Sequence, residues 1–487
     1  MGIDRRAALT VAAIYAASHA LYWWLGVRFD ASTLFGYMQF IDVELLAHRL
    51  LESLWYYHAN PPLLNLFAGV GLKVFGAGAP AFFAVVFHLL GLMTAMAVHV
   101  LTRALADSRL AADIATAILV FSPSFVLYEN WLMYSFPAAA LLAVSAALLH
   151  RYASTGAARW GAAFFGVLAV LLLTRSLFHL GWLIMVTGLL ALAMRGRRRQ
   201  VLACAALPIL AVALWYGKNY YLFGTFATST WFGLGLSNIS TLLVTRQELE
   251  PLVQRGELSQ YALVSRYAQT DRLFAQQPSP TGVPVLDQVR KPTGPYNYNN
   301  QQIVAIGRDY TADGLRVMRT FPKSYAIGLV ISNRLFFSPS SMNLYFSPDN
   351  LAAALPMETV FNRVLYAVPA RPGLMEQPHF GFTQSYVLQV NFSLMLMLAW
   401  WLTLAYGYAQ ARRSVPASEP SQQARALVIG FIVFTALYIY AVGTAFELGE
   451  NFRYRWIVEP LVLVLAVTGV THALRLIRGR LAARLQP

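Results

Sequence analysis

The chain has 487 residues, of which 57% are hydrophobic and only 12% are charged. A soluble chain of this length needs more charge on its surface, so the composition excludes an ordinary soluble domain and indicates a polytopic membrane protein. The formal net charge is +15, but most of the excess is arginine in short loops between apolar runs. That is the positive-inside pattern of membrane proteins and not a nucleic-acid-binding surface.

Apolar runs predict an all-α fold with about ten membrane-spanning helices. In chain order the predicted spans are residues 7–27, 80–102, 110–128, 136–150, 160–174, 177–194, 201–217, 386–409, 424–446 and 456–477. Residues 160–194 as one helix would be about 52 Å long, against a hydrocarbon core of about 30 Å. We therefore predict a turn at 174–176, which brings Arg175 and His179 to the outer surface.

The orientation follows from the arginine-rich loops, which all fall on the cytoplasmic side when both termini are cytoplasmic. This requires residues 61–76 not to cross the membrane. The Pro61–Pro62 pair suits a helix start, the stretch is too short to span, and Lys73 can extend to the interface. We predict a short interfacial helix there, with a full crossing as the alternative.

The topology divides the chain into three parts. Residues 1–217 form an N-terminal transmembrane catalytic module that includes a first outer loop at 28–79. Residues 218–383, rich in Pro and Asn, form an extracytoplasmic segment of short helices and loops, in which 324–337 is interfacial or packed between spans. Residues 384–487 contain the last transmembrane helices.

The first outer loop holds three candidate site residues. Asp30 directly follows the first span and is either a solvated carboxylate at a helix end or a catalytic base. Residues 40–55 have apolar side chains at helical spacing, which predicts an amphipathic helix in the membrane interface. Asp42, near its start, is either a site carboxylate or a helix N-cap. His58 is positioned by the rigid Pro-Pro pair that follows it.

Ionisable residues at the outer ends of later spans complete the candidate site. Glu129 lies in the second outer loop, where a carboxylate beside the membrane needs a partner. Four cations are predicted to face the same compartment and to bind the phosphate group of a ligand: Arg175, Lys218, Arg453 and Arg455. The alternative for each is that it anchors a helix end to lipid phosphate. His179 shares the turn with Arg175. Glu450 is expected to orient Arg453 or Arg455 through an ion pair.

The order of these features resembles the GT-C membrane glycosyltransferases, in the branch of the protein O-mannosyltransferases and the aminoarabinose transferases of lipid A. The resemblance rests on Asp30 after the first span, on the His58-x-Asn60-Pro61-Pro62-Leu63 stretch, on residues 121–137, and on residues 450–455 ahead of Glu459. The family commonly has an Asp-Glu pair where this chain has Asp30-Ala31. Whether Asp30 or Asp42 takes the leading role is therefore left open.

The resemblance implies inverting transfer of a sugar from a polyprenyl-phosphate carrier to an acceptor on the outer face. On that reading Asp30 is the general base, Asp42 and Glu129 support it, and His58 positions the substrate. The four cations named above clamp the phosphate. One alternative is an oligosaccharide ligase or polymerase with a diphosphate donor. Another is a transporter or flippase, which would place ionisable residues at mid-membrane depth instead of at span ends.

The chain lacks the short motifs of nucleotide and zinc enzymes: it has no P-loop, HExxH or CxxC pair, and Cys204 is its single cysteine. We predict no metal site and no nucleic-acid partner, while the sequence does not decide whether a divalent metal takes part. The expected partners are a polyprenyl-phosphate-linked sugar, a glycan, lipid or protein acceptor, and membrane lipid. The expected location is a bacterial inner membrane, with the site facing the periplasm.

Overall fold

The computed structural model describes residues 5–266, 269–275, 278–343, 345–368, 391–414 and 419–484. These residues form helices, loops and two isolated β-bridges, with no β-strand among them. The all-α prediction is confirmed for this part of the chain.

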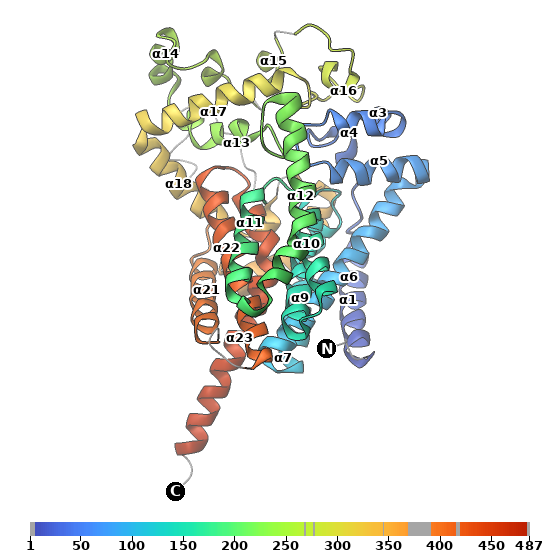
Figure 1. Cartoon of the computed structure of the whole chain (residues 1–487), viewed down its shortest axis with the longest axis vertical. Helices are drawn as coiled ribbons and strands as arrows, with labels where there is room; N and C mark the ends of the chain where they lie inside the picture. The colour runs from blue at the N-terminus through green and yellow to red at the C-terminus, as the bar shows by residue number, and fades with distance from the viewer. Residues whose placement is uncertain are drawn as a thin grey trace.

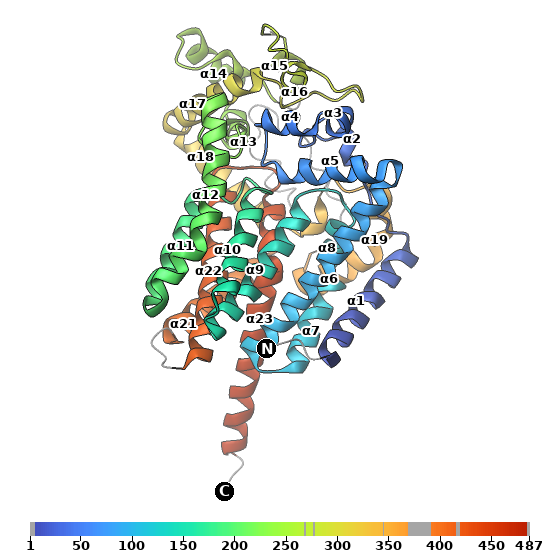
Figure 2. The same cartoon turned by 45° about the vertical axis from the view of Figure 1, so that its right-hand side comes forward.

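The main body is a bundle of long helices (Figures 1 and 2). Its helices are α1 Arg5–Leu25, α6 Ala79–Ala106, α7 Arg109–Val120, α8 Pro123–Glu129, α9 Ser135–Thr155, α10 Ala158–Leu172, α11 Leu180–Ala193, α12 Arg198–Phe223, α21 Leu394–Ser414, α22 Pro420–Ala445 and α23 Asn451–Arg484. Every predicted span coincides with one or two of them, although residues 386–390 of the eighth lie outside the described residues. Among the described residues, six helices are long and apolar enough to cross a membrane, or seven if the bent pair of α7 and α8 is one span. The count of about ten stays a prediction.

The third predicted span is not one straight helix. It is broken after α7, and α8 continues at an angle of 60°. Pro123 opens α8, and the residue before a proline is disfavoured in a helix, so the Ser122–Pro123 step is the physical cause of the bend. All seven residues of α8 are buried, and the bend turns Glu129 into the bundle instead of leaving it in an outer loop.

The first outer loop folds into four short helices: α2 Thr33–Gly36, α3 Val43–His48, α4 Leu50–Trp55 and α5 Leu63–Phe75. The single amphipathic helix expected over 40–55 is divided at Arg49, whose φ of −125° and ψ of 39° are not helical. Helix α5 lies across the end of α6 and not alongside it (Figures 1 and 2), as expected of an interfacial helix. The turn η1 Gly76–Gly78 joins them, and Gly76 takes a φ of +52° that favours glycine.

The segment between α12 and α21 covers the same end of the bundle. Its helices are α13 Phe232–Ile239, η3 Thr241–Leu243, α14 Arg246–Gln254, η4 Gln260–Leu263, α15 Thr270–Leu273, α16 Pro284–Asp287, α17 Gln302–Thr320, α18 Pro322–Phe336, η5 Ser340–Met342, α19 Pro348–Phe361 and η6 Asn362–Tyr366. Helices α13 to α17, called the cap below, sit over the end of the bundle (Figures 1 and 2). Helix α13 approaches α17 so closely that a Cβ on Gly233 would lie 2.1 Å from the carbonyl oxygen of Gly307.

Helix α18 packs against α22 and α23, which agrees with the prediction that residues 324–337 lie against the spans. The predicted boundary at 217/218 falls inside α12, which continues to Phe223, and residues 369–383 of the predicted segment lie outside the described residues. Helix α1 begins and α23 ends at the end of the bundle away from the cap (Figures 1 and 2). Both helix ends thus lie on one side of the bundle, and their cytoplasmic location stays a prediction.

Candidate functional site

A cavity of about 550 Å³ lies where the cap meets the bundle. This volume is within the range of small-molecule ligand sites, roughly 300–1,000 Å³. Its walls come from the first outer loop, the α10–α11 turn, the segment before α13, α13 itself and the loop between α22 and α23. The lining includes these polar and aromatic side chains: Asn60, Tyr134, Arg175, His179, Trp231, Asn238, Arg266, Tyr345, Phe446, Glu447, Glu450 and Tyr454.

Arg175 is a buried cation on the wall of this cavity. It is 5% exposed, and its guanidinium carbon lies 4.1 Å from the ring centre of Tyr134 and 5.1 Å from that of Tyr454. Its Nε makes no hydrogen bond, and no carboxylate in the described residues forms an ion pair with it. A buried guanidinium without a counter-ion is energetically unfavourable, so this part of the cavity wall favours binding of an anionic ligand. The predicted outer-surface location of Arg175 is wrong, because the two tyrosines enclose it.

Glu450 lines the cavity and pairs with Arg453, which is buried and does not line it. Arg453 Nη1 donates to Glu450 Oε1 and Oε2 at 2.8 and 2.9 Å, and its Nη2 donates to the Tyr134 hydroxyl at 2.6 Å. Glu450 therefore orients Arg453, as the sequence predicted. The charge of Arg453 is largely neutralised by this pair, while the carboxylate of Glu450 faces the cavity.

Glu447 is a second carboxylate on the cavity wall, and the sequence analysis missed it. Its Oε1 accepts hydrogen bonds from Asn238 Nδ2 at 3.1 Å and from the Leu448 backbone N–H at 3.3 Å. The guanidinium of Arg266 lies 4.0 Å away. Burial raises the pKa of Glu447 above its usual range. A carboxylate with a raised pKa beside a cavity is a candidate general base.

Asp30 does not line the cavity. Its backbone pairs with the stretch after α8: its N–H donates to the Asn130 carbonyl at 2.8 Å, and its carbonyl accepts from the Leu132 N–H at 3.0 Å. Its Oδ1 accepts the backbone N–H of Ser32 at 2.8 Å. Trp131, in the same stretch, has its ring 5.5 Å from the guanidinium of Arg453.

Asp42 is the N-cap of α3, the second of its two predicted roles. Its Oδ1 accepts the backbone N–H groups of Glu44 and Leu45 at 3.0 and 3.4 Å, and the residue is 4% exposed. A buried capping carboxylate away from the cavity does not support catalysis there.

Besides Arg453, two of the four predicted phosphate clamps are bound to the protein itself. Lys218 Nζ donates to the carbonyls of Trp55 and Tyr57 at 3.0 and 2.9 Å, which ties α12 to the end of α4. Arg455 donates to two carbonyls, to Ser340 and to Glu459, and is fully buried. Neither lines the cavity, so the prediction that both face an outer ligand is corrected.

Comparison with known proteins adds two distant structures. No protein-family model matches the chain, and no curated protein matches it. The crystal structure of ArnT from Cupriavidus metallidurans bound to undecaprenyl phosphate is 15% identical, covers 93% of this chain and 77% of that chain, and has a TM-score of 0.36. The apo structure of the same protein is 12% identical, covers 95% of this chain and 76% of that chain, and has a TM-score of 0.32. These scores are low, so we argue function from the site itself.

Glu129 does not join Arg175 at the cavity. Its side chain is fully buried and contacts His19 of α1 and His88 of α6. The expectation of an outer-loop carboxylate near the phosphate clamps is therefore wrong for this residue. His179, in contrast, is exposed at the cavity, and its Nδ1 lies 2.9 Å from the Tyr438 hydroxyl.

His58 joins the first outer loop to the cap and does not face the cavity. Its Nδ1 lies 2.8 Å from the Thr230 hydroxyl, its Nε2 lies 3.0 Å from the Asn299 carbonyl, and its backbone N–H donates to Asn299 Oδ1 at 2.8 Å. Both ring nitrogens are thus used within the fold. This differs from the substrate-positioning role that the resemblance implied.

We expect His58→Ala to destabilise the protein by about 1–3 kcal/mol for each polar partner left unpaired. Burial lowers the pKa of His58 from 6.5 to about 3. Because the unfolded chain binds the proton more readily, His58 contributes stability above pH 6.5 that is lost as the pH falls towards 3. Thermal unfolding in detergent across this window, with His48→Ala on the exposed face of α3 as the control, measures both effects. Equal acid sensitivity of wild type and His58→Ala would contradict the assignment.

Proposed function

We propose that the protein transfers a sugar from a polyprenyl-phosphate carrier to an acceptor in the cavity between cap and bundle. The observation that carries the proposal is Arg175, a buried cation with no carboxylate partner in the described structure, on the wall of a cavity that also holds two carboxylates. The sequence resemblance to the GT-C glycosyltransferases leads to the same activity.

Arg175 suits the carrier phosphate for two reasons. A guanidinium binds phosphate through two parallel hydrogen bonds, and the two tyrosine rings hold its plane in place. The leaving polyprenyl phosphate is an anion, so a cation fixed in a water-poor site stabilises the charge that develops as the sugar–phosphate bond breaks. The long apolar tail of such a donor would stay in the lipid beside the bundle.

Glu447 suits the role of general base. An acceptor hydroxyl must lose its proton as it attacks the sugar, and a carboxylate whose pKa burial raises above its usual range accepts that proton more readily. Direct attack by the acceptor in one displacement inverts the anomeric carbon. Asp30 is the alternative base from the sequence, but it does not line the cavity.

Purified protein in detergent should release polyprenyl monophosphate from an undecaprenyl-phosphate-linked sugar when membranes are supplied as the acceptor source. A panel of hexose and pentose donors covers the sugar classes, and heat-inactivated protein is the control.

Release of a polyprenyl diphosphate from a diphosphate donor would instead identify a ligase or polymerase. Absence of product with every donor, in protein that binds the lipid, would favour a transporter. Asp30→Asn with full activity would remove Asp30 from the base role.

A further inference from the structure

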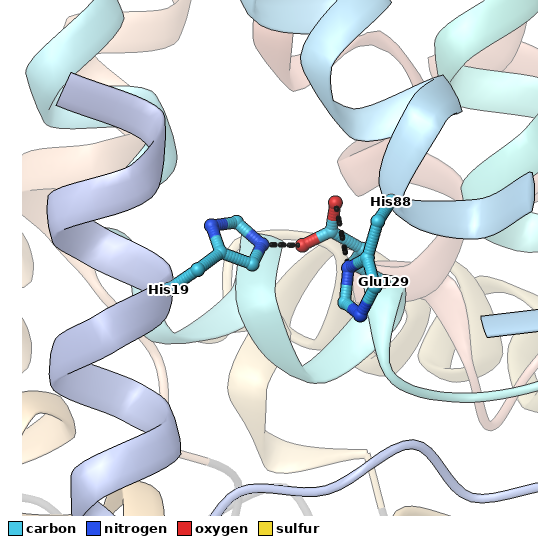
Figure 3. A group of neighbouring side chains, drawn as sticks. All are labelled: His19, His88 and Glu129. Atoms are coloured by element: carbon cyan, nitrogen blue, oxygen red, sulfur yellow. Dashed lines mark hydrogen bonds and ion pairs between the residues drawn. The ribbon is translucent and has the colours of Figure 1, made fainter. Parts of the chain in front are cut away.

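Three side chains that the cavity does not use meet inside the bundle. Figure 3 shows His19 of α1, His88 of α6 and Glu129 of α8 pointing towards one another, with Glu129 between the two imidazoles. Their ligand atoms all lie within 4.8 Å of one another. His88 is nine residues into α6, roughly 14 Å below its start at 1.5 Å per residue. The cluster therefore lies away from the end of α6 that joins the first outer loop.

The hydrogen bonds show that this cluster is short of positive charge. His19 Nδ1 faces the Tyr15 carbonyl at 2.9 Å and must carry a proton, because a carbonyl only accepts. In a neutral imidazole this leaves a lone pair on His19 Nε2, directed at Glu129 Oε2. Two acceptors that face each other in a buried site need a proton or a cation between them.

The second carboxylate oxygen of Glu129, Oε1, also has too few donors around it. The Tyr15 hydroxyl has one proton but faces two acceptors, the His88 carbonyl at 2.8 Å and Glu129 Oε1. His88 Nδ1 is buried without a hydrogen bond, 3.6 Å from Glu129 Oε1. A proton on His19 would satisfy His19 and Glu129 Oε2 but would leave His88 Nδ1 without a partner. One divalent cation would satisfy both imidazoles and the carboxylate together.

We propose that His19, His88 and Glu129 bind a transition-metal ion of the zinc class. Two imidazole nitrogens and one carboxylate oxygen form a ligand set that Zn²⁺ prefers, with a fourth position left for water. Ligands at zinc distances in a tetrahedron are about 3.4 Å apart. The 3.6 Å between His88 Nδ1 and Glu129 Oε1 is close to this value. The imidazoles, with side chains 19% and 38% exposed, have room to adjust.

Two surrounding residues fit the same site. Metal-bound histidines commonly donate their second ring N–H to a backbone carbonyl, as His19 does to Tyr15. Gly91 makes space for the carboxylate, because a Cβ at that position would lie 1.7 Å from Glu129 Oε1. The ion would join α1 to α6 and to α8. The proposal does not depend on the sugar-transfer activity.

The test is the metal content of the full chain, purified in detergent with an affinity tag that lacks histidine. We expect elemental analysis to find about one zinc per chain in wild type and close to none in His88→Gln. His99→Gln is the matched control, because His99 also lies in α6 and pairs with a carboxylate, its Nε2 lying 3.0 Å from Asp113. This control should keep the zinc.

Cobalt titration of chelator-treated protein should produce the visible absorption of four-coordinate Co²⁺ in wild type and His99→Gln but not in His88→Gln. Tyr15→Phe keeps all three ligands and should weaken zinc binding by roughly 10–100-fold, as expected for loss of a supporting hydrogen bond. Wild type that neither contains nor takes up metal would overturn the proposal and leave an imidazolium–carboxylate pair. Equal metal content in folded wild type and His88→Gln would also overturn it.

Discussion

Replacing Arg175 by glutamine is expected to lower sugar transfer by roughly 10²–10³-fold, the usual effect of removing one group that stabilises developing charge in an enclosed site. The guanidinium is buried between Tyr134 and Tyr454 without an ion-pair partner in the described residues, so its charge is available to a ligand. The measurement is the rate of polyprenyl monophosphate release, together with the affinity for undecaprenyl phosphate.

Two further variants separate charge from geometry. Arg175→Lys keeps the charge but loses the planar fork, so we expect a partial loss of activity. Arg28→Gln is the control, because Arg28 also stacks on an aromatic ring, that of Trp23 at 4.7 Å, but does not line the cavity. Removal of a buried cation that lacks a partner should not lower the melting temperature. Normal transfer and normal lipid affinity in Arg175→Gln would refute the phosphate site.

The helices of the bundle could be predicted from the sequence because a lipid environment imposes length and hydropathy on helices that cross it. The same reasoning predicted the α10–α11 turn, since one helix over 160–194 would be too long, and the turn placed Arg175 near the site. The bend before α8 was missed, although the Ser122–Pro123 step was a visible signal. That step decides where Glu129 points.

The roles of the polar residues could be predicted only in part, because charge counts do not reveal hydrogen-bond partners. Lys218 and Arg455 have the right charge for a phosphate but donate hydrogen bonds to backbone carbonyls. A hydropathy pattern does not reveal such bonds. His19 and His88 lie within apolar runs, far apart in the sequence, and only the packing of α1 against α6 brings them to Glu129. Glu447 was overlooked in a short loop where Glu450 has the obvious arginine partner.

Replacing Glu447 by glutamine is expected to reduce transfer by about 10²–10⁴-fold, the range for loss of a general base. In wild type the rate should fall as the pH decreases through the raised pKa of Glu447, because the protonated carboxyl cannot accept the acceptor's proton. The residual rate of Glu447→Gln should lack this acid limb. Glu358→Gln is the matched control, because burial also raises the pKa of Glu358. The Glu358 carboxylate accepts a 3.0 Å hydrogen bond from the Ser341 hydroxyl and does not line the cavity.

Stability provides the independent check on Glu447. Burial raises its folded-state pKa above the ordinary value of 4.5, so the folded protein holds the proton more tightly than the unfolded chain does. Its contribution to stability is therefore present below pH 4.5 and is lost as the pH rises through the folded-state pKa. Glutamine does not ionise, so Glu447→Gln lacks this loss of stability with rising pH. The variant should therefore melt no lower than wild type at neutral pH. A variant that is inactive yet equally stable places Glu447 in the chemistry, whereas a variant that loses activity only as it unfolds would assign it to the fold.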